Sequence, residues 1–472
     1  MKKIKPLVEA LQQFTEKTPI SLHVPGHKNG LLSNLPPKLK DALIYDATEL
    51  TGLDDFHHPE EAIALAELLL QETYGSEKSF FLINGSTVGN LAMIYATCES
   101  GDTILVQRNA HKSIFHAIEL VGAKAVYLSP EWDERTKTAG AVSYEVLNKA
   151  IKQYPQAKAI IFTYPTYYGV TSKVLKQQIE LAHANHIPVL IDEAHGAHFV
   201  ASTHLPVSAL ELGADIVVQS AHKTLPAMTM GSFMHIKSTL IHVERVNKYL
   251  RMLQSSSPSY VIMASLDDAR HYVASYLESD FRSFMEKRSN FIDALQRIPS
   301  LEVIETDDPL KILLRAKKHS GFLLKEALEK QNVFVELADI EQVLFVLPLL
   351  KQGTSYPFTQ LKVKVKDALL SLQNTVPTKV ELGPIPVVEM ITTMEMTMKE
   401  VDYAETEWIS YTKAIGRISA EMIIPYPPGI PLFIKGEKIT VEKLTQLAEL
   451  KSFNIDFQGT HQLEQNLIKV IK

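Results

Sequence analysis

The 472-residue sequence lacks several features that define whole classes of protein. It has one cysteine, Cys98, which excludes an internal disulfide and any four-cysteine zinc site. It has no run of about 18 apolar, uncharged residues, so we expect no membrane-spanning helix. Its formal net charge is -6, and there is no basic excess to attract nucleic acid or an anionic membrane. The lone cysteine fits a reducing compartment, and we expect a cytoplasmic protein.

The first residues also lack the pattern of a secretory signal. The segment MKKIKPLVEALQQF begins with basic residues but has no apolar core of about 7–15 residues and no small-residue cleavage site. Leu7, Ala10, Leu11 and Phe14 recur at helical spacing. The segment therefore predicts an amphipathic helix.

Short apolar runs alternate with longer helical patterns between about residue 66 and residue 240. Such runs are typical of strands that are buried on both faces of a parallel sheet. They are Ser79–Ile83, Thr103–Val106, Ala125–Leu128, Ala159–Phe162, Pro188–Ile191 and Asp215–Val218. The predicted helices between them include Val88–Thr97, Ser113–Val121, Tyr144–Gln153 and Val174–Asn185. The alternation predicts right-handed βαβ units in an α/β fold with a mostly parallel sheet.

The pattern changes after about residue 240. A mostly helical stretch leads into a mixture of strands (Leu301–Ile304, Leu310–Leu314, Val343–Leu347) and helices (Gly321–Lys330, Leu361–Leu372). Three prolines and a glycine in Val376–Val388 indicate a connection. We predict an N-terminal segment (1–65), a large domain (66–297) and a smaller α+β C-terminal domain (298–472).

Polar and ionisable residues follow the predicted strands. Ligands in open α/β sheets bind beyond the carboxyl ends of the strands, so these residues are candidates for one shared site. They are Asn84-Gly85-Ser86-Thr87, Arg108 to Ser113 with His111, Thr163 to Gly169 with Thr166, Asp192 to His198 with His195, and Ser220-Ala221-His222-Lys223.

Each candidate also has an ordinary explanation. Ser86 and Thr87 at a helix start suit an anion, but such residues also cap helices without any ligand. Asp192 caps the next element or holds a proton on a ring nitrogen, and most lysines like Lys223 are solvated. His195 and His198 near Asp192 raise the possibility of a metal, but we see no complete ligand set and expect none.

The order of these candidates favours one cofactor, pyridoxal 5′-phosphate (PLP). A phosphate cradle, an aspartate at a strand end and a lysine at the next strand end match the phosphate, the ring nitrogen and the aldehyde carbon of that molecule. A lysine in that position is able to form a Schiff base if its environment lowers its pKa.

The sequence resembles the Orn/Lys/Arg decarboxylase family, in its short bacterial form, along nearly its whole length. The most specific elements are His23-Val24-Pro25-Gly26-His27-Lys28 and Ser220-Ala221-His222-Lys223. The others are Asp46-Ala47-Thr48-Glu49, the segments at Asn84, Arg108, Pro165 and Asp192, and Pro425 to Pro431 with Gly436-Glu437. The resemblance implies a fold type I, PLP-dependent transferase-like large domain. The extra N-terminal domain of the long forms is not matched, so their decamer is not assumed, and a homodimer is the minimum expected.

The resemblance also implies roles for individual residues. Lys223 would form the Schiff base, Asp192 would pair with the pyridinium nitrogen, and His111 would stack on the ring; these three are the predicted catalytic residues. The phosphate would be held by Ser86, Thr87, Ser220 and His222, with Thr166 and His195 also near the cofactor. His195 stands where longer relatives have a tryptophan.

The implied reaction is decarboxylation of arginine, lysine or ornithine to CO₂ and agmatine or a diamine, which feeds polyamine metabolism. A cationic substrate requires a carboxylate at the far end of its site, because an unpaired buried cation is costly. The candidates are Asp46, Glu49, Asp54, Asp55, Glu421 and Glu437; Asp46, Glu49, Glu421 and Glu437 are favoured.

Two alternatives remain open on the sequence alone. One is another fold type I enzyme, an aminotransferase or a lyase; in an aminotransferase Arg417 would clamp the α-carboxylate. The other is a protein that binds PLP without catalysis, which the presence of both Lys223 and Asp192 disfavours.

Overall fold

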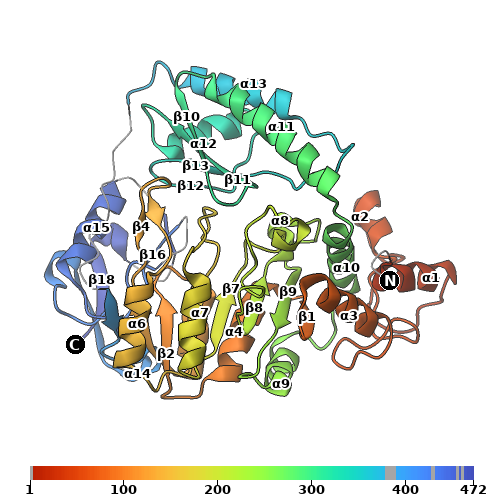
Figure 1. Cartoon of the computed structure of the whole chain (residues 1–472), viewed down its shortest axis with the longest axis horizontal. Coiled ribbons are helices and arrows are strands. Elements are labelled where there is room, and N and C mark those ends of the chain that lie inside the picture. Colours follow the sequence, from red (N-terminus) through yellow and green to blue (C-terminus); the bar gives the residue numbers. More distant parts are fainter. Residues whose placement is uncertain (1–3, 378–389, 427–430, 453–455, 459–461) are drawn as a thin grey trace. The chain divides into compact units, whose positions relative to one another are not determined.

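The computed structural model describes residues 4–377, 390–426, 431–452, 456–458 and 462–472. It divides into two compact units, which are unit 1 (Met1–Ala96 and Leu190–Leu277) and unit 2 (Thr97–Val189 and Glu278–Lys472). Figure 1 labels most of their helices and strands. Two segments named in the sequence analysis lie partly outside the described residues. They are the proline-rich segment Pro425–Pro431, of which 427–430 are not described, and most of the predicted connection Val376–Val388.

Unit 1 is built on four strands, in the order β1 (Lys78–Leu82), β9 (Ser232–Ile236), β8 (Ile216–Gln219) and β7 (Val189–Asp192). β7 pairs with β8 in parallel, whereas β9 pairs antiparallel with both β8 and β1. β1, β7 and β8 therefore run in the same direction. Their carboxyl ends lie at one edge of the sheet.

Several helices accompany these strands in unit 1. They are α1 (Pro6–Glu16), α2 (Pro37–Ala42), α3 (Ala62–Tyr74), α4 (Gly85–Thr97), α8 (Ala221–Thr224), α9 (Val243–Leu253) and α10 (Tyr260–Ala274), with a short 3₁₀ turn, η1 (Phe199–Ala201). A Cβ at Gly89 of α4 would lie 2.7 Å from side-chain atoms of both Leu82 and Val218. The glycine thus lets α4 approach β1 and β8 closely, which fixes where the first turn of α4 lies.

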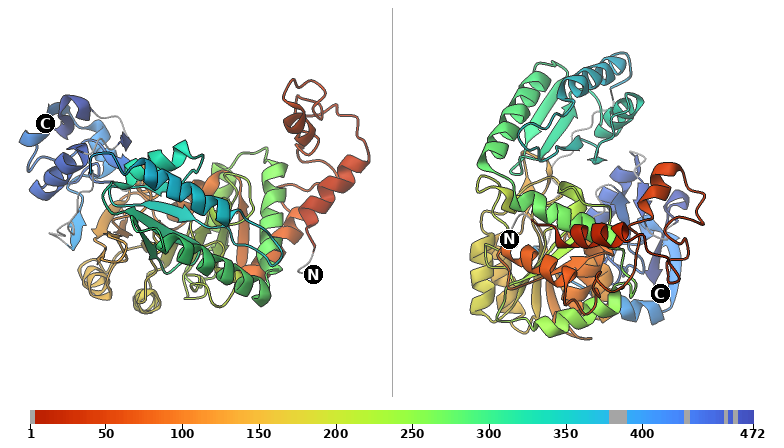
Figure 2. Two further views of the ribbon diagram at one scale, coloured as in Figure 1. Left: turned by 90° about the horizontal axis from the view of Figure 1, so that it is seen from above. Right: turned by 90° about the vertical axis from the view of Figure 1, so that its right-hand side faces the viewer.

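The N-terminal helix is amphipathic as predicted. Leu7 and Leu11 of α1 are buried, and α1 packs against α3 and α10. The segment after it, drawn in red in Figure 2, extends away from the strands of unit 1 and carries α2. Its large apolar side chains Ile20, Leu22, Leu31 and Leu32 are exposed.

The first part of unit 2 has a second set of strands, in the order β6 (Ala159–Thr163), β2 (Thr103–Gln107), β3 (Lys124–Leu128) and β14 (Ile391–Thr393). β2 is parallel to β6 and β3, and only β14 is antiparallel to its neighbour among these four. The accompanying elements are α5 (Lys112–Val121), α6 (Tyr144–Gln153), α7 (Leu175–Ala184) and the hairpin β4 (Trp132–Asp133) and β5 (Thr138–Ala139).

The rest of unit 2 is α+β. An antiparallel sheet has the order β10 (Leu301–Glu305), β11 (Lys311–Ala316), β13 (Val343–Val346) and β12 (Leu337–Ala338). It packs with α11 (Glu278–Gln296) and α12 (Gly321–Lys330), and α13 (Phe358–Ser371) packs against these two helices. The C-terminal elements are α14 (Met398–Tyr403), β15 (Thr406–Ser410), η2 (Tyr411–Lys413), β16 (Ile424–Tyr426), α15 (Val441–Ser452), β17 (Asp456–Gln458), η3 (Leu463–Gln465) and β18 (Leu467–Ile471). Ile423, Phe433, Leu447 and Val470 form part of their own core.

The predicted fold class is confirmed. All six strands predicted between about residue 66 and residue 240 are present within one residue of the expected bounds. In each unit three of the four strands of the α/β sheet run in the same direction. The structure adds β9 and β14, which the alternation did not predict. No helix in the described ranges is long and apolar enough to cross a membrane.

Candidate functional site

Lys223 lies beside His195 in unit 1. The lysine belongs to α8, which begins directly after β8, and His195 follows β7 by three residues. The Nζ of Lys223 is 3.0 Å from the Nε2 of His195. His195 is buried, so an amine and an imidazole meet at the carboxyl edge of the strands.

Asp192 is the last residue of β7 and is buried. Its Oδ2 accepts a hydrogen bond from Nδ2 of Asn90 at 3.0 Å, and its Oδ1 accepts one from the backbone N–H of Ala194 at 3.2 Å. Both donors are neutral, so they orient the carboxylate without neutralising its charge. Asn90 lies on α4, and sequence reasoning did not find it, because a buried asparagine within a helix gives no distinctive pattern.

Hydroxyl groups gather where α4 begins. Ser86 and Thr87 are the second and third residues of that helix, and Oγ of Ser220 donates to Oγ of Ser86 at 2.8 Å. The Nδ1 of His222 is 3.0 Å from the carbonyl oxygen of Gly231, and because a carbonyl only accepts, this nitrogen carries the proton. The N–H groups of a helix start, together with hydroxyls, suit a phosphate.

These residues of unit 1 fit PLP. The buried Asp192 carboxylate, the Lys223 amine and the paired hydroxyls of Ser86 and Ser220 all belong to elements at one edge of one sheet. The carboxylate suits the pyridinium of PLP, the primary amine suits its aldehyde, and the hydrogen-bond donors suit its phosphate.

Two further predicted cofactor residues lie in unit 2. His111 caps the start of α5, where its side chain accepts from the backbone N–H of Ser113. Thr166 is buried and its Oγ1 accepts from the backbone N–H of Val170 at 3.2 Å. The carbonyl of Thr166 accepts a hydrogen bond from Lys311, a fully buried lysine.

The candidate substrate carboxylates of unit 1 have partners within that unit. Asp46 accepts from Nε2 of His27 at 3.0 Å, and Glu49 accepts from the hydroxyl of Thr48. Asp54 accepts from several backbone N–H groups around the start of α3, including those of Glu60 and Ile63, both at 2.9 Å. Burial raises the pKa of Asp54, but these backbone donors outweigh it and leave the pKa lowered.

The two candidates of unit 2 differ in their partners. Glu437 accepts hydrogen bonds from both Nη1 and Nη2 of Arg108, at 2.5 and 2.8 Å. It also forms an ion pair with Nζ of Lys443 at 2.6 Å. Burial alone would raise the pKa of Glu437, but the charges of Arg108 and Lys443 hold it below its usual value. Arg108 belongs to one of the motifs that carry the family resemblance, and its role as the partner of Glu437 was not predicted.

Glu421 is buried and accepts only a neutral donor among the described residues. Its Oε1 accepts the backbone N–H of Lys469 at 2.7 Å, and its Oε2 has no hydrogen-bond partner within the described ranges. Burial raises the pKa of Glu421 to about 7.

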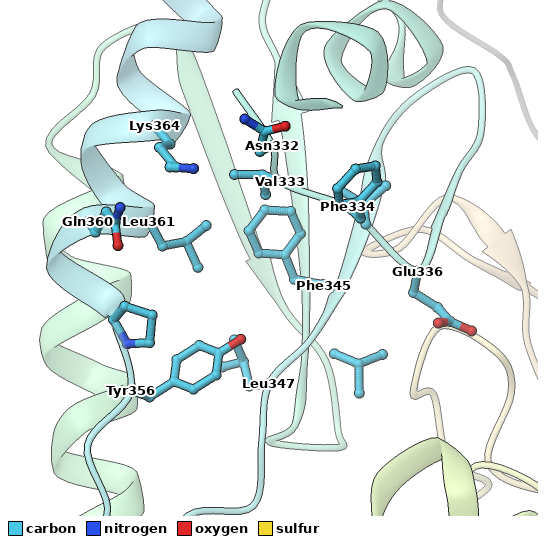
Figure 3. A pocket seen from close by; sticks show the side chains of 13 residues that line it. Asn332, Val333, Phe334, Glu336, Phe345, Leu347, Tyr356, Gln360, Leu361 and Lys364 are labelled. Atoms are coloured by element: carbon cyan, nitrogen blue, oxygen red, sulfur yellow. The ribbon is translucent and has the colours of Figure 1, made fainter. Parts of the chain in front are cut away.

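A cavity of about 390 Å³ lies elsewhere in unit 2, between β13 and α13. Figure 3 shows Phe334, Phe345 and Tyr356 around it. None of the predicted site residues lines it. Among the described residues no group of three or more His, Cys, Asp or Glu side chains is arranged to hold a metal ion.

Comparisons with known proteins agree with one another. The model of the Orn/Lys/Arg decarboxylase major domain matches residues 5–314, and that of the C-terminal domain of the same family matches residues 384–463. The chain is 45% identical to the uncharacterized protein YaaO of Bacillus subtilis, with 98% of each chain covered. It is 33% identical to an arginine decarboxylase of Bacillus anthracis, with 99% of this chain and 97% of that protein covered.

The fold is similar to that of a solved lysine decarboxylase from Francisella novicida. The TM-score is 0.80 at 20% identity, with 100% of this chain and 81% of that chain covered. The predicted PLP-dependent, fold type I architecture is confirmed.

Proposed function

The chain belongs to the Orn/Lys/Arg decarboxylase family, and from that premise we propose that it converts arginine into agmatine and CO₂. It is a PLP-dependent enzyme that decarboxylates basic amino acids. The observation that carries the choice of arginine is the similarity of the whole chain, at 33% identity, to a relative named arginine decarboxylase. The solved lysine decarboxylase is only 20% identical.

Different residues of unit 1 would hold different parts of the cofactor. Lys223 would bind it covalently, Asp192 would accept a hydrogen bond from its protonated ring nitrogen, and Ser86, Thr87, Ser220 and His222 would bind its phosphate. When bound, PLP supplies an electron sink for the electron pair left as CO₂ departs. Asn90 and the N–H of Ala194 keep the Asp192 carboxylate in one orientation.

His195 is proposed to control the proton on Lys223. Its Nε2 lies within hydrogen-bond distance of the lysine amine, so an unprotonated imidazole accepts a hydrogen bond from the amine there. The lysine amine is a nucleophile only when it is neutral. The resemblance also assigns His111 and Thr166 to the cofactor, and these two assignments remain predictions.

The carboxylate that would receive the arginine side chain is proposed among Asp46, Glu49, Glu421 and Glu437. Planar, bidentate pairing suits a guanidinium better than an ammonium. Glu437 already makes such a pair with Arg108, whereas Glu421 has an oxygen without a partner among the described residues. Glu421 is therefore the first of the four to test.

The test is a substrate comparison with purified protein. We expect kcat/KM for arginine to exceed that for lysine and ornithine, with norleucine far below all three. Replacement of a true side-chain carboxylate, as in Glu421→Gln, should lower activity on arginine and leave the low activity on norleucine unchanged. A preference for lysine or ornithine would overturn the choice of arginine, and a preference for norleucine would overturn the choice of a cationic substrate.

The aminotransferase alternative has weaker support. Its proposed carboxylate clamp, Arg417, donates to Glu407 at 2.7 Å and also to the carbonyl oxygen of Ile471. The guanidinium is therefore already paired within the C-terminal part of unit 2.

We also propose that the enzyme is a cytoplasmic homodimer that contributes to polyamine metabolism. The lone cysteine supports a reducing compartment. The exposed Ile20, Leu22, Leu31 and Leu32 support a second copy, because large apolar side chains grouped on one segment are typical of interaction surfaces.

A further inference from the structure

A chain of hydrogen bonds crosses all four strands of unit 1, with one side chain at each strand. Glu193 follows β7, Gln219 ends β8, His235 lies in β9 and Ser79 lies in β1. Their order matches the strand order β7-β8-β9-β1. We call Glu193, Gln219, His235 and Ser79 the transverse network.

The contacts of the network are short, and all four side chains are fully buried. Nε2 of Gln219 lies 2.5 Å from Oε2 of Glu193, and Nε2 of His235 lies 3.1 Å from Oε1 of Gln219. Oγ of Ser79 lies 2.7 Å from Nδ1 of His235. The sequence alone marked Glu193 only as a neighbour of Asp192.

The chemistry of the four groups fixes the direction of every hydrogen bond when Glu193 is ionised. Its carboxylate then only accepts, so Gln219 donates its amide N–H to Glu193 and turns its carbonyl oxygen to His235. His235 must then donate from Nε2, which leaves Nδ1 to accept the hydroxyl proton of Ser79. This arrangement requires a neutral imidazole, and burial lowers the pKa of His235 to about 3.

Glu193 is the hydrogen-bond acceptor at one end of the transverse network. It also accepts the hydroxyl of Ser208 at 3.0 Å and the backbone N–H of Ala209 at 2.6 Å. Burial raises the pKa of Glu193 to about 7, against the opposing effect of Ala209, Gln219 and Ser208. An isosteric glutamine would turn an N–H group toward at least one of these donors, so the position specifically requires two acceptor oxygens.

The network ends beside the cofactor residues. Glu193 is covalently next to Asp192, and Gln219 is next to Ser220, whose hydroxyl contacts Ser86. The backbone N–H of Glu193 donates to Val218 at 2.8 Å and that of Ser220 to Ala194 at 3.3 Å. Fixing the Glu193–Gln219 pair therefore fixes the spacing between Asp192 and the segment Ser220–Lys223.

We propose that Glu193 is a positioning residue, which acts through Gln219 to hold Asp192 and the Ser220–Lys223 segment in the geometry that binds PLP. The proposal rests on the PLP site and does not depend on which basic amino acid is the substrate.

The experiment compares Glu193→Gln with the exchanged pair Glu193→Gln/Gln219→Glu. In the exchanged pair the amide oxygen at position 193 accepts from the backbone N–H of Ala209. The amide nitrogen replaces the oxygen that accepted from both Ser208 and Gln219, so it donates to the carboxylate at position 219 and to the hydroxyl of Ser208. The carboxylate at position 219 also accepts from His235, so every contact of the network again has a donor and an acceptor, and the charge lies one strand further along. Ser79→Ala is a milder variant at the far end of the network.

The readouts are the Kd of the apoprotein for PLP, measured by fluorescence titration, the thermal midpoint of the apoprotein, and kcat and KM. We expect Glu193→Gln to weaken PLP binding about tenfold or more and to lower kcat, with KM for the substrate nearly unchanged. The exchanged pair should recover most of the PLP affinity, and Ser79→Ala should weaken PLP binding less than Glu193→Gln.

The matched control is Glu67→Gln. Glu67 is another buried glutamate of unit 1, paired with Lys78 at 3.0 Å and absent from the network. Its replacement should lower the thermal midpoint without changing the Kd for PLP. The proposal is overturned if Glu193→Gln binds PLP like the wild type, if Glu67→Gln weakens PLP binding equally, or if the exchanged pair binds PLP no better than Glu193→Gln. Because PLP affinity is measured without substrate, this failure is distinct from a failure of the arginine assignment.

Discussion

At the scale of single residues, Asp192 is proposed to keep the ring nitrogen of the cofactor protonated through its negative charge. Replacement by asparagine nearly preserves its shape but removes the negative charge that favours a protonated ring nitrogen. It also turns an amide N–H toward Asn90 or Ala194, which both donate to the native carboxylate. We expect Asp192→Asn to lower kcat by at least about 10²-fold, equivalent to about 2.7 kcal/mol of barrier. Near-normal kcat in a variant with normal PLP content would assign Asp192 a purely structural role.

Lys223 is expected to be the residue that binds the cofactor covalently. Borohydride reduction of the holoenzyme followed by peptide mass spectrometry should find the pyridoxyl group on Lys223. Lys223→Ala should abolish turnover while the apoprotein keeps its thermal midpoint. A pyridoxyl group on any other lysine would disprove the assignment.

Glu421 makes stability depend on pH through its raised pKa. Its pKa rises from 4.5 to about 7 in the folded chain because of burial, so the folded state binds the proton more tightly than the unfolded state. Stability is therefore highest below pH 4.5, falls as the pH rises to about 7, and stays lower above that. Glutamine keeps an acceptor for the N–H of Lys469, so Glu421→Gln should raise the thermal midpoint at pH 8 and change it little at pH 4.5.

Glu400 serves as a control for Glu421, because its pKa is shifted in the opposite direction. It caps α14 together with Thr397, and the hydrogen bonds from Thr397 lower its pKa. Its stabilising contribution is present above pH 4.5 and is lost as the pH falls. Glu400→Gln should therefore lower the thermal midpoint more at pH 8 than at low pH. Equal shifts for Glu421→Gln at both pH values would contradict the account of Glu421.

At the scale of helices and strands, the sequence predicts the elements whose patterns are local. Tyr144–Gln153 and Gly321–Lys330 were predicted with the observed bounds, because each is an amphipathic run that follows a serine cap. β9 was missed because Ser232–Ile236 contains a histidine and a serine that appear polar in sequence. In the fold their side chains are buried, and His235 belongs to the transverse network.

The attachment of α1 to α10 depends on a buried ion pair. Arg270 donates to Asp267 at 2.5 Å and to the carbonyl oxygen of Ile4 at 2.6 Å, while Asp267 accepts the N–H of Leu7 at 3.0 Å. Arg270→Met leaves a buried carboxylate without its cation, which costs about 3–5 kcal/mol. We expect a lower thermal midpoint and faster proteolysis within residues 4–17.

The double variant Asp267→Asn/Arg270→Met serves as the control for that prediction. Asparagine retains an acceptor for Leu7 without a buried charge, so the double variant should be more stable than Arg270→Met alone. If the two variants are equally stable, the buried charge is not the cause of the loss.

At the scale of the whole molecule, sequence reasoning indicates candidate site residues that lie at strand ends and gives no sign of contacts between distant partners. Lys223, Asp192 and Ser86 are predicted as cofactor residues because each lies at or just after the end of a predicted strand, and their roles stay predictions. The pairing of Glu437 with Arg108, 329 positions apart, has no signal in a single sequence. Asn90 and the transverse network were missed for the same reason, since their partners lie on separate strands or helices.

The central claim for the whole molecule is that this enzyme removes a carboxylate and keeps the amine. The most direct test is product analysis of arginine turnover by the purified holoenzyme in D₂O. We predict equal amounts of CO₂ and agmatine, with one deuterium on the carbon that carried the carboxylate. Formation of the keto acid of arginine in place of CO₂ and agmatine would contradict the account.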